Sequence, residues 1–275
     1  MMFLAYGLKD HFRMFIKIKD KKLGDNFIKN GYLICKITNK KDLQFINEEF
    51  TKFFEKRFKT KIKNSQKFFN NIHNKISLKD LNDIRLSLIN DVTSKKKFRI
   101  SYYNIAQDIL NCIAGNELAM QNSINLSIQL PKDKSSLLTM HADTWSGDSP
   151  FEVVIWLPLV NVYKTKSMYI LPANQYSFFE KKILKYKNKS SSFLFDKIKN
   201  KVKWLNIKHG EFLIFNQSLP HGNVVNEEKE SRISMNCRFK GLYTPYGSKT
   251  IGDFFEPITL KPATHIGINY EFPKI

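Results

Sequence analysis

The chain has few cysteines and no long apolar run. Its three cysteines, Cys35, Cys112 and Cys237, are far apart and lack a Cys-x-x-Cys spacing, which argues against a disulfide framework and a zinc knuckle. No apolar stretch reaches the ~18 residues that a membrane helix needs. The stretch before Lys9 is too short for a secretory signal. We therefore expect a soluble protein of the cytoplasm.

Arginine is also scarce, because only six of the 45 basic residues are Arg. The net charge of +20 is compatible with a nucleic-acid partner. However, direct base readout favours the guanidinium fork, and no nucleic-acid motif is present. Abundant Lys, Asn, Ile and Phe together are what an AT-rich coding sequence gives. We therefore expect no nucleic-acid partner, whereas an anionic small substrate remains compatible with the charge.

Apolar residues are plentiful, at 42% of the 275 residues, including 23 Phe, so the chain can bury a sizeable core. Its first part is rich in Lys and has apolar residues spaced by three and four, which is typical of amphipathic helices. This spacing covers 43–58, 64–75, 78–90 and 102–114. We expect a mainly helical N-terminal region, 1–118, that packs on a core.

The pattern changes after about residue 119. Short runs now alternate with period two between Pro, Gly, Asn and Asp, which is typical of a β-sandwich or barrel. The predicted strands cover 124–130, 137–142, 151–158, 166–171, 202–208, 211–216 and 231–239. The sequence therefore predicts a mainly β protein with additional helices, whose second region, 119–275, is the β core with an insertion around 175–200.

A His and an Asp stand two residues apart in LLTMHADTW. If this segment is a strand, His141 and Asp143 point to the same face. His221 follows a neighbouring predicted strand, in Pro-His-Gly, and completes a set of three ligands. Two His and one carboxylate with open positions are the ligand pattern of non-haem Fe(II) oxygenases. We expect these three residues to bind the metal and to form the catalytic centre.

The last predicted strand, 231–239, has one polar and one apolar face. The polar face carries Arg232, Ser234, Asn236 and Arg238, and the apolar face carries Ile233, Met235, Cys237 and Phe239. An Arg buried in a barrel needs an anionic partner, because an unpaired buried charge is very costly. A dicarboxylate co-substrate supplies one, since the guanidinium fork binds a carboxylate through two parallel hydrogen bonds. A Ser hydroxyl adds a third.

Together these motifs resemble the 2-oxoglutarate/Fe(II)-dependent oxygenase superfamily. The resemblance rests on HAD at 141–143, PHGN at 220–223 and SRIS at 231–234, and it covers about residues 119–240. Within the superfamily, the chain resembles the phytanoyl-CoA dioxygenase-like branch. It also looks like oxygenases of bacterial carbohydrate-biosynthesis clusters.

The resemblance implies a double-stranded β-helix, a jelly-roll or cupin-like core. It also implies Fe(II), 2-oxoglutarate as co-substrate, O2, and hydroxylation of a polar small molecule such as a sugar or nucleotide sugar. By this resemblance His141, Asp143 and His221 are the metal ligands. Arg232 and Ser234 would bind the distal carboxylate of 2-oxoglutarate.

The chain departs from the family pattern at two places. The family often has Gly-Asp at 210–211, where this chain has Gly-Glu, and a Pro-Gly-Ser-His turn near 172–174, where it has Pro-Ala-Asn. Neither departure touches the ligand set. An Asp at position 143 disfavours the halogenase variant, which needs that position vacated for halide.

Five further side chains are candidates for the site. Gln129 would bind co-substrate or be an interior residue bonded to backbone. Trp145 would stack on substrate or cap the barrel mouth. Tyr169 and Asn125 are expected to face inward towards substrate, and Arg238 is the reserve for Arg232 and a candidate substrate contact. Asp148 is expected to shape a turn.

Four histidines lack ligand spacing and are expected to be structural or exposed: His11, His73, His209 and His265. The chief alternative function is a non-catalytic β-sandwich module that binds carbohydrate. Such a module requires no metal and tolerates loss of Arg232, whereas the oxygenase requires both.

Overall fold

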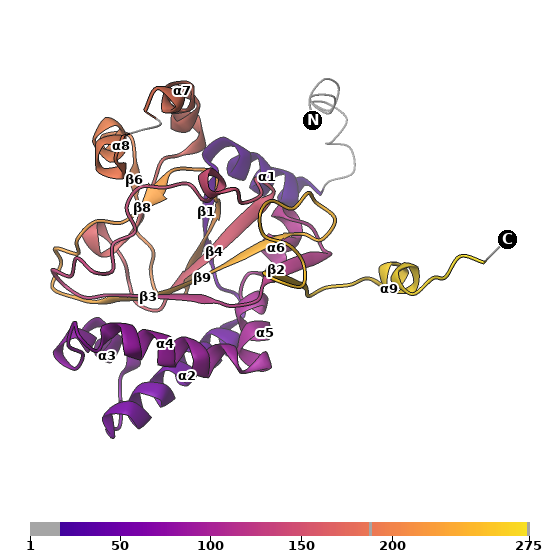
Figure 1. Cartoon of the computed structure of the whole chain (residues 1–275). Coiled ribbons are helices and arrows are strands. Elements are labelled where there is room, and N and C mark those ends of the chain that lie inside the picture. Colours follow the sequence, from indigo (N-terminus) through magenta and orange to yellow (C-terminus); the bar gives the residue numbers. More distant parts are fainter. Residues whose placement is uncertain (1–16, 187–188, 274–275) are drawn as a thin grey trace.

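The computed structural model describes residues 17–186 and 189–273 (Figure 1). The segment considered as a secretory signal and His11 lie outside the described residues. The helices are α1 (Ile18–Asn30), α2 (Lys40–Phe58), α3 (Ser65–Asn70), α4 (Leu81–Thr93), α5 (Lys96–Asn104), α6 (Gln107–Ile113), α7 (Ala173–Ile183), α8 (Ser191–Ile198) and α9 (Pro262–Ile268), with short 3-10 turns that include η3 (Asp143–Ser146). The strands are β1 (Tyr32–Lys36), β2 (Leu118–Gln121), β3 (Asn125–Gln129), β4 (Glu152–Pro158), β5 (Tyr169–Ile170), β6 (Lys203–Trp204), β7 (Glu211–Asn216), β8 (His221–Gly222), β9 (Arg232–Gly241) and β10 (Phe255–Pro257).

These strands form two antiparallel sheets. The larger has the order β1-β7-β4-β9-β2-β10, with β3 also paired to β9, and the smaller has the order β6-β5-β8. β4 is central, since it pairs with β7 on one side and β9 on the other, and all of its residues are buried. Its nearly continuous apolar sequence is what a strand covered on both faces requires.

Helices α2 to α5 form a layer against one face of the larger sheet (Figure 1). Phe50 and Phe54 of α2, Phe69 of α3 and Phe98 of α5 are fully buried in the same core as Phe239 of β9. Burying one such side chain contributes about 1.5–3 kcal/mol relative to leaving it exposed. The apolar face of β9 therefore packs under the helices, as its alternation predicts, and its polar face lies on the opposite side.

Three local predictions are wrong. The segment 102–114 holds the end of α5 and a separate α6, and 137–142 is not a strand but contributes a single bridge at His141. β1, within the region read as helices and turns, pairs with β7. The partner of β1 lies far along the chain, so the pairing that stabilises it is not visible in its local pattern. The division at residue 118 stays a prediction.

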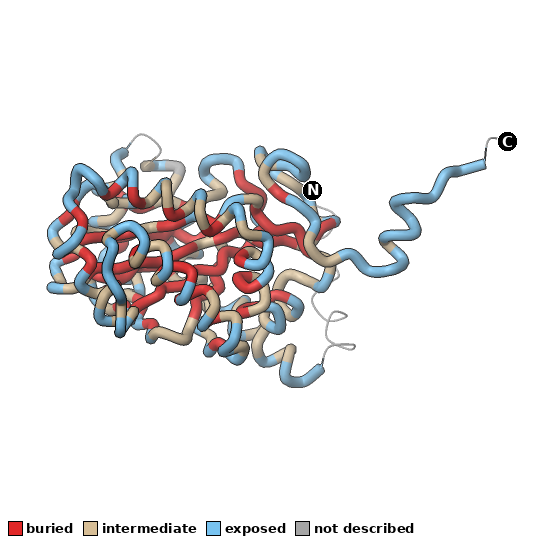
Figure 2. Tube along the Cα trace, turned by 90° about the horizontal axis from the view of Figure 1, so that it is seen from below, coloured by how far each residue is buried: buried red, intermediate tan, exposed pale blue. Residues whose placement is uncertain are grey.

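Buried residues follow the sheets through the body of the protein (Figure 2). After β10 the chain extends away from this body, and most of its side chains there are exposed (Figures 1 and 2). The insertion around 175–200 contains α7 and α8, whose Phe179, Leu194 and Ile198 bury a small core of their own with Tyr169 of β5. No helix in the described ranges is long and apolar enough to cross a membrane.

Candidate metal centre

Two histidines from distant segments face each other across a β-bridge. The backbone of His141 donates to His221 O at 3.0 Å, and that of His221 donates to His141 O at 2.8 Å. Directly opposed residues of an antiparallel pair place their side chains on the same face, and here the ring centroids are 4.4 Å apart. The bridge therefore brings the two imidazoles together, although the segment around His141 is not a strand.

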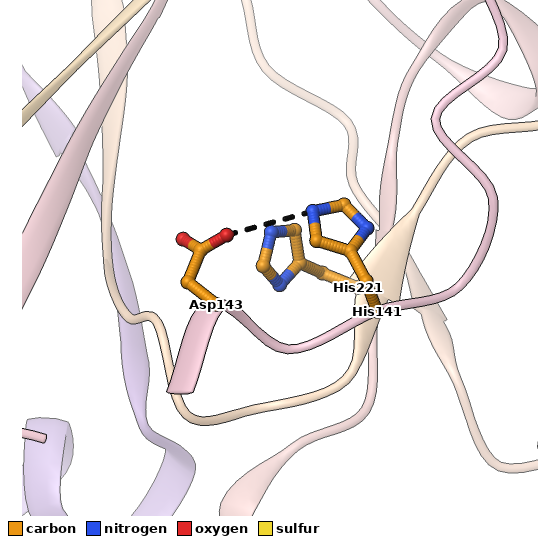
Figure 3. A group of neighbouring side chains, drawn as sticks. All are labelled: His141, Asp143 and His221. Atoms are coloured by element: carbon orange, nitrogen blue, oxygen red, sulfur yellow. Dashed lines mark ion pairs between the residues drawn. The ribbon is translucent and has the colours of Figure 1, made fainter. Parts of the chain in front are cut away.

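Asp143 completes the group from the start of η3. Its backbone N–H donates to Gln217 O at 3.0 Å, which ties η3 to the segment just before His221. Candidate ligand atoms of His141, Asp143 and His221 all lie within 4.8 Å of one another (Figure 3). The structure thus brings together the three residues that the sequence predicted as ligands. A β-bridge positions His141 and a 3-10 turn positions Asp143, whereas the sequence predicted that both residues lie on one face of a strand.

The histidine tautomers suit a metal. Nδ1 of His141 lies 2.7 Å from Thr139 O, and Nδ1 of His221 lies 2.8 Å from Leu219 O. A carbonyl oxygen only accepts hydrogen bonds, so each Nδ1 carries the proton and each Nε2 keeps its lone pair. A hydrogen bond from the ring nitrogen that does not bind the metal fixes the orientation of a histidine ring at metal sites. Both imidazoles are therefore prepared to bind a cation through Nε2.

His221 is held in its neutral form. Desolvation, and next the neighbouring His141, lower the pKa of His221 to about 4. Metal ligation requires the neutral imidazole, so this histidine is ready to bind at neutral pH.

The residue after His221 is a glycine in a crowded position. A Cβ on Gly222 would lie 2.8 Å from both Leu138 O and Tyr169 Oη. Glycine is therefore needed at this position to keep the strand close to its neighbours.

The three side chains open into a cavity of about 290 Å³ between the two sheets. Its lining contains the ligands, the two arginines of β9, and polar and apolar residues: Asn125, Ser127, Leu138, Val154, Trp156, Met168, Phe215, Gly222, Asn223 and Asn236. The volume is near the lower end of the range of ligand pockets. The site therefore suits small molecules.

Arg232 lies at the buried end of the polar face of β9, and it is 3% exposed. Its guanidinium donates to Ser167 O and Ser127 Oγ, each at 3.2 Å, and lies 5.9 Å from the Trp156 ring centroid. Among the described residues no carboxylate pairs with it. Desolvation accordingly lowers the pKa of Arg232 to about 10. This is a buried cation that still lacks its anion.

Several buried polar atoms on or near Arg232 have no hydrogen-bond partner within the described part of the chain. They are Arg232 Nε, Ser234 Oγ, Gln129 Oε1 and Ser167 Oγ. Gln129 lies opposite Arg232 in the β3–β9 register, and its amide nitrogen donates to Val224 O at 2.7 Å. Buried polar groups are rarely left unpaired, so this cluster is organised for a bound anion. Of the three predicted cofactor-binding residues, Arg232 lines the cavity, whereas Gln129 and Ser234 are not among its lining residues. Their contact with co-substrate stays a prediction.

Arg238 lies in a different environment from Arg232, although both are on the same face of β9. It forms ion pairs with Asp143 and Asp148 and is 4.0 Å from Glu152. Sequence reasoning assigned Asp148 to a turn and did not select Glu152. A signal was present, because a Glu in an otherwise apolar strand needs a buried partner. Arg238 lines the cavity, and its predicted contact with substrate stays a prediction.

Of the other predicted substrate contacts, one lines the cavity and two do not. Asn125 lines the cavity and donates to Asn236 Oδ1 at 2.9 Å. Tyr169 is buried against Phe195 and Trp204 and does not line this cavity. Trp145 is 40% exposed on η3 and lies outside the cavity lining. Contacts of Trp145 and Tyr169 with substrate stay predictions.

No protein-family model and no curated protein matches the sequence. Solved structures do match the fold. SnoK, a non-haem alpha-ketoglutarate-dependent carbocyclase from nogalamycin biosynthesis, has a TM-score of 0.53 and 12% identity over 87% of this chain and 96% of that chain. EctD from S. alaskensis, solved with 2-oxoglutarate and 5-hydroxyectoine, has a TM-score of 0.52 and 13% identity over 84% of this chain and 78% of that chain.

A nickel complex of the non-haem monooxygenase ThoJ has a TM-score of 0.51 and 13% identity, over 88% of this chain and 85% of that chain. At these identities the similarity establishes a shared fold. The chain therefore combines helices and antiparallel sheets in the fold of non-haem oxygenases that include alpha-ketoglutarate-dependent enzymes. The particular branch and the carbohydrate cluster stay predictions, and the chemistry has to be argued from the site.

Proposed function

We propose that the protein is an Fe(II)- and 2-oxoglutarate-dependent dioxygenase with a double-stranded β-helix core. The observation that carries the proposal is the uncompensated guanidinium of Arg232 in the same cavity as a His-Asp-His cluster. Two His and one carboxylate that leave positions open favour Fe(II) of the oxygenase type. A buried cation with free donors beside it favours a carboxylate. A dicarboxylate that chelates the metal at one end fits both features.

Each residue has a distinct task in this proposal. His141, Asp143 and His221 would hold Fe(II), which supplies the oxidative chemistry with O2 and 2-oxoglutarate when bound. Arg232 would bind the distal carboxylate of 2-oxoglutarate, with Ser234 as a further donor. The burial of Arg232 excludes water and thereby strengthens that ion pair. No side chain of the site has to act as a general base.

The substrate proposed is a polar small molecule, of the class of sugars or nucleotide sugars of surface-carbohydrate biosynthesis. The amide pair Asn125–Asn236 supports this, because their mutual bond uses one donor and one acceptor and leaves further amide groups for hydroxyls. Arg238 is compensated by Asp143 and Asp148, and Arg232 would be occupied by co-substrate. A neutral reacting portion therefore fits the site better than an anionic one.

The test is binding and turnover in the full chain. Titration of 2-oxoglutarate with Mn(II) present should show binding that disappears without metal, and Fe(II) should support succinate formation. His141→Ala should abolish both, whereas His265→Ala, on the exposed α9, should change neither. Absent or metal-independent 2-oxoglutarate binding would contradict the proposal and favour the carbohydrate-binding module.

A further inference from the structure

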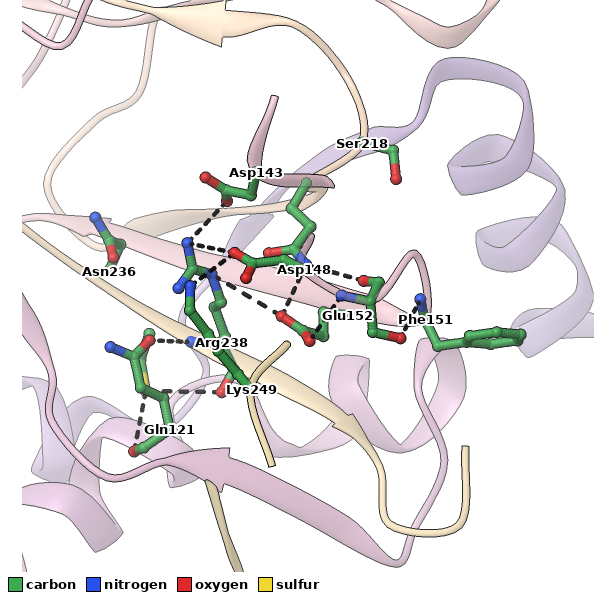
Figure 4. Close-up of polar contacts among 12 residues, drawn as sticks. Gln121, Asp143, Asp148, Phe151, Glu152, Ser218, Asn236, Arg238 and Lys249 are labelled. Atoms are coloured by element: carbon green, nitrogen blue, oxygen red, sulfur yellow. Dashed lines mark hydrogen bonds and ion pairs between the residues drawn. The ribbon is translucent and has the colours of Figure 1, made fainter. Parts of the chain in front are cut away.

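The two carboxylate oxygens of Asp143 face different groups. Oδ1 lies 3.6 Å from His141 Nε2, on the side of the imidazoles. Oδ2 lies 3.2 Å from Arg238 Nη2 (Figure 4). One oxygen is therefore available to a metal between the histidines, while the other is engaged by a guanidinium. This arrangement favours binding of the metal through a single oxygen.

Arg238 is itself held in place from several sides. The same Nη2 lies 3.3 Å from Asp148 Oδ2, and Nε lies 4.0 Å from Glu152 Oε2 (Figure 4). The Phe254 ring centroid is 5.6 Å from the guanidinium carbon. Asp148 and Glu152 are almost completely buried. A cation packed among buried carboxylates has little freedom, so its position relative to Asp143 is fixed.

The carboxylates behind Arg238 are anchored in turn. Gln217 Nε2 donates to Glu152 Oε2 at 2.7 Å and to Ser149 O at 2.9 Å. The backbone oxygen of Gln217 accepts the N–H of Asp143 at 3.0 Å. The contacts thus form a ring through Asp143, Arg238, Glu152 and Gln217, which is closed between Arg238 and Glu152 by an ion pair at 4.0 Å and not by a hydrogen bond. Both the backbone and the side chain of Asp143 are fixed by this ring.

Opposing influences act on the carboxylate of Glu152. Desolvation raises its pKa above the ordinary value, and the hydrogen bond from Gln217 and the charge of Arg238 offset only part of that rise. Lys249 Nζ lies 2.8 Å from Asp148 Oδ2 and adds a second cation. Lys240 lies opposite Glu152 in the β4–β9 register and interacts with its charge. Three cations therefore lie near Asp143, Asp148 and Glu152, and the charge of Arg238 is balanced within this group.

We propose that Arg238 is a positioning residue, which orients Asp143 so that one carboxylate oxygen faces the metal. The inference rests on the proposed metal site. Groups that orient a ligand typically change metal affinity by about 10–100-fold when they are mutated. Charge alone predicts the opposite sign, because removal of a cation near the site reduces repulsion of Mn(II). The direction of the effect therefore separates positioning from simple electrostatics.

The experiment measures Mn(II) affinity by calorimetric titration of the full chain without 2-oxoglutarate. We expect Arg238→Gln to weaken Mn(II) binding by about 10-fold or more and to alter the Mn(II) electron paramagnetic resonance spectrum. Arg238→Lys keeps the charge but not the fork, so it should give a smaller loss. Arg57→Gln removes an exposed Arg that pairs with Asp83 on the helical layer, and it should bind Mn(II) as the wild type does.

Melting temperatures of the metal-free variants show whether each is folded. If Arg238→Gln does not fold, the Mn(II) affinity of Arg238→Lys tests the inference, since this variant preserves a cation for the buried carboxylates. Equal or tighter Mn(II) binding in either folded variant would overturn the inference while leaving the proposed function intact. A wild-type chain that binds no Mn(II) would overturn both.

Discussion

Arg232 and Arg238 extend from the same face of β9, six residues apart, yet their surroundings differ in charge. Among the described residues, the partners of buried Arg232 are neutral: Ser167 and Ser127. Arg238 is surrounded by carboxylates, one of which belongs to the candidate metal ligand Asp143. An uncompensated buried cation is costly and is therefore suited to bind an anionic ligand. A compensated one is suited to hold a structure in place.

The difference shows that the role of an arginine cannot be predicted from its residue type and from the face of the strand on which it lies. Both side chains satisfy the same sequence pattern, and both line the same cavity. Their partners come from other segments: Asp148 and Glu152 lie near the start of β4, and Ser127 lies on β3. Four measurements would break or sharpen this comparison.

The largest effect is expected from Arg232→Gln. Loss of one partner of a buried charge pair costs about 2–5 kcal/mol, so 2-oxoglutarate affinity should fall by at least about 30-fold. Mn(II) affinity should change by less than about threefold, which is the reverse of the pattern expected for Arg238→Gln. Calorimetric titrations of Mn(II) and of 2-oxoglutarate measure both quantities. Similar losses in the two variants would remove the distinction between the arginines.

The second measurement uses His221, which lines the same cavity as the two arginines. Desolvation lowers the folded-state pKa of His221 to about 4, below its unfolded value of about 6.5. The unfolded state therefore binds more protons between these values, so stability decreases as the pH falls from about 6.5 to about 4. The loss should reach about 3 kcal/mol in metal-free protein.

Urea unfolding with a chelator present, at steps between pH 7 and pH 4, measures this loss. His221→Gln removes the titrating group and should flatten the profile. Arg238→Gln should retain the decrease of stability with falling pH, because desolvation and His141 lower the pKa of His221 more than Arg238 does. A wild-type profile that is flat in this interval would contradict the assignment.

A smaller effect is expected from Ser234→Ala. The Ser234 hydroxyl is buried and unpartnered, so its removal leaves no described group without a partner. A hydrogen bond to a charged group contributes about 1.5–3 kcal/mol, and 2-oxoglutarate affinity should therefore fall by about 10-fold. Melting temperature should change little, as for the exposed control Ser123→Ala. Unchanged affinity would exclude Ser234 from the anion site.

The smallest effect is expected from Lys249→Gln, on the side of Arg238. Lys249 pairs with Asp148 at 2.8 Å, but its side chain is 29% exposed. Solvent screening limits such pairs to about 0.2–1 kcal/mol, so Mn(II) affinity should change by less than about fivefold. Calorimetric titration measures it beside Arg238→Gln. A loss as large as that expected for Arg238→Gln would mean that Lys249, and not Arg238, maintains the charge balance around Asp143.

Much of the larger sheet was predictable because alternation is a local property. The apolar face of 231–239 packs under the helices, and Arg232, Asn236 and Arg238 of its polar face line the cavity, as period two requires. The strands at 211–216 and 151–158 agree with β7 and β4 to within a residue at each end. The local pattern failed where pairing is distant, as for β1, or where a single bridge replaces a strand, as at His141.

The sequence by itself determined which three residues are the candidate ligands and that Arg232 and Arg238 share one face of β9. These depend on residue type and on spacing along one segment. Only the tertiary structure decided which arginine is left without an anion, because the carboxylates that neutralise Arg238 come from η3, its following loop and β4. A net charge can be counted along the chain, but compensation of a buried charge depends on distances between segments.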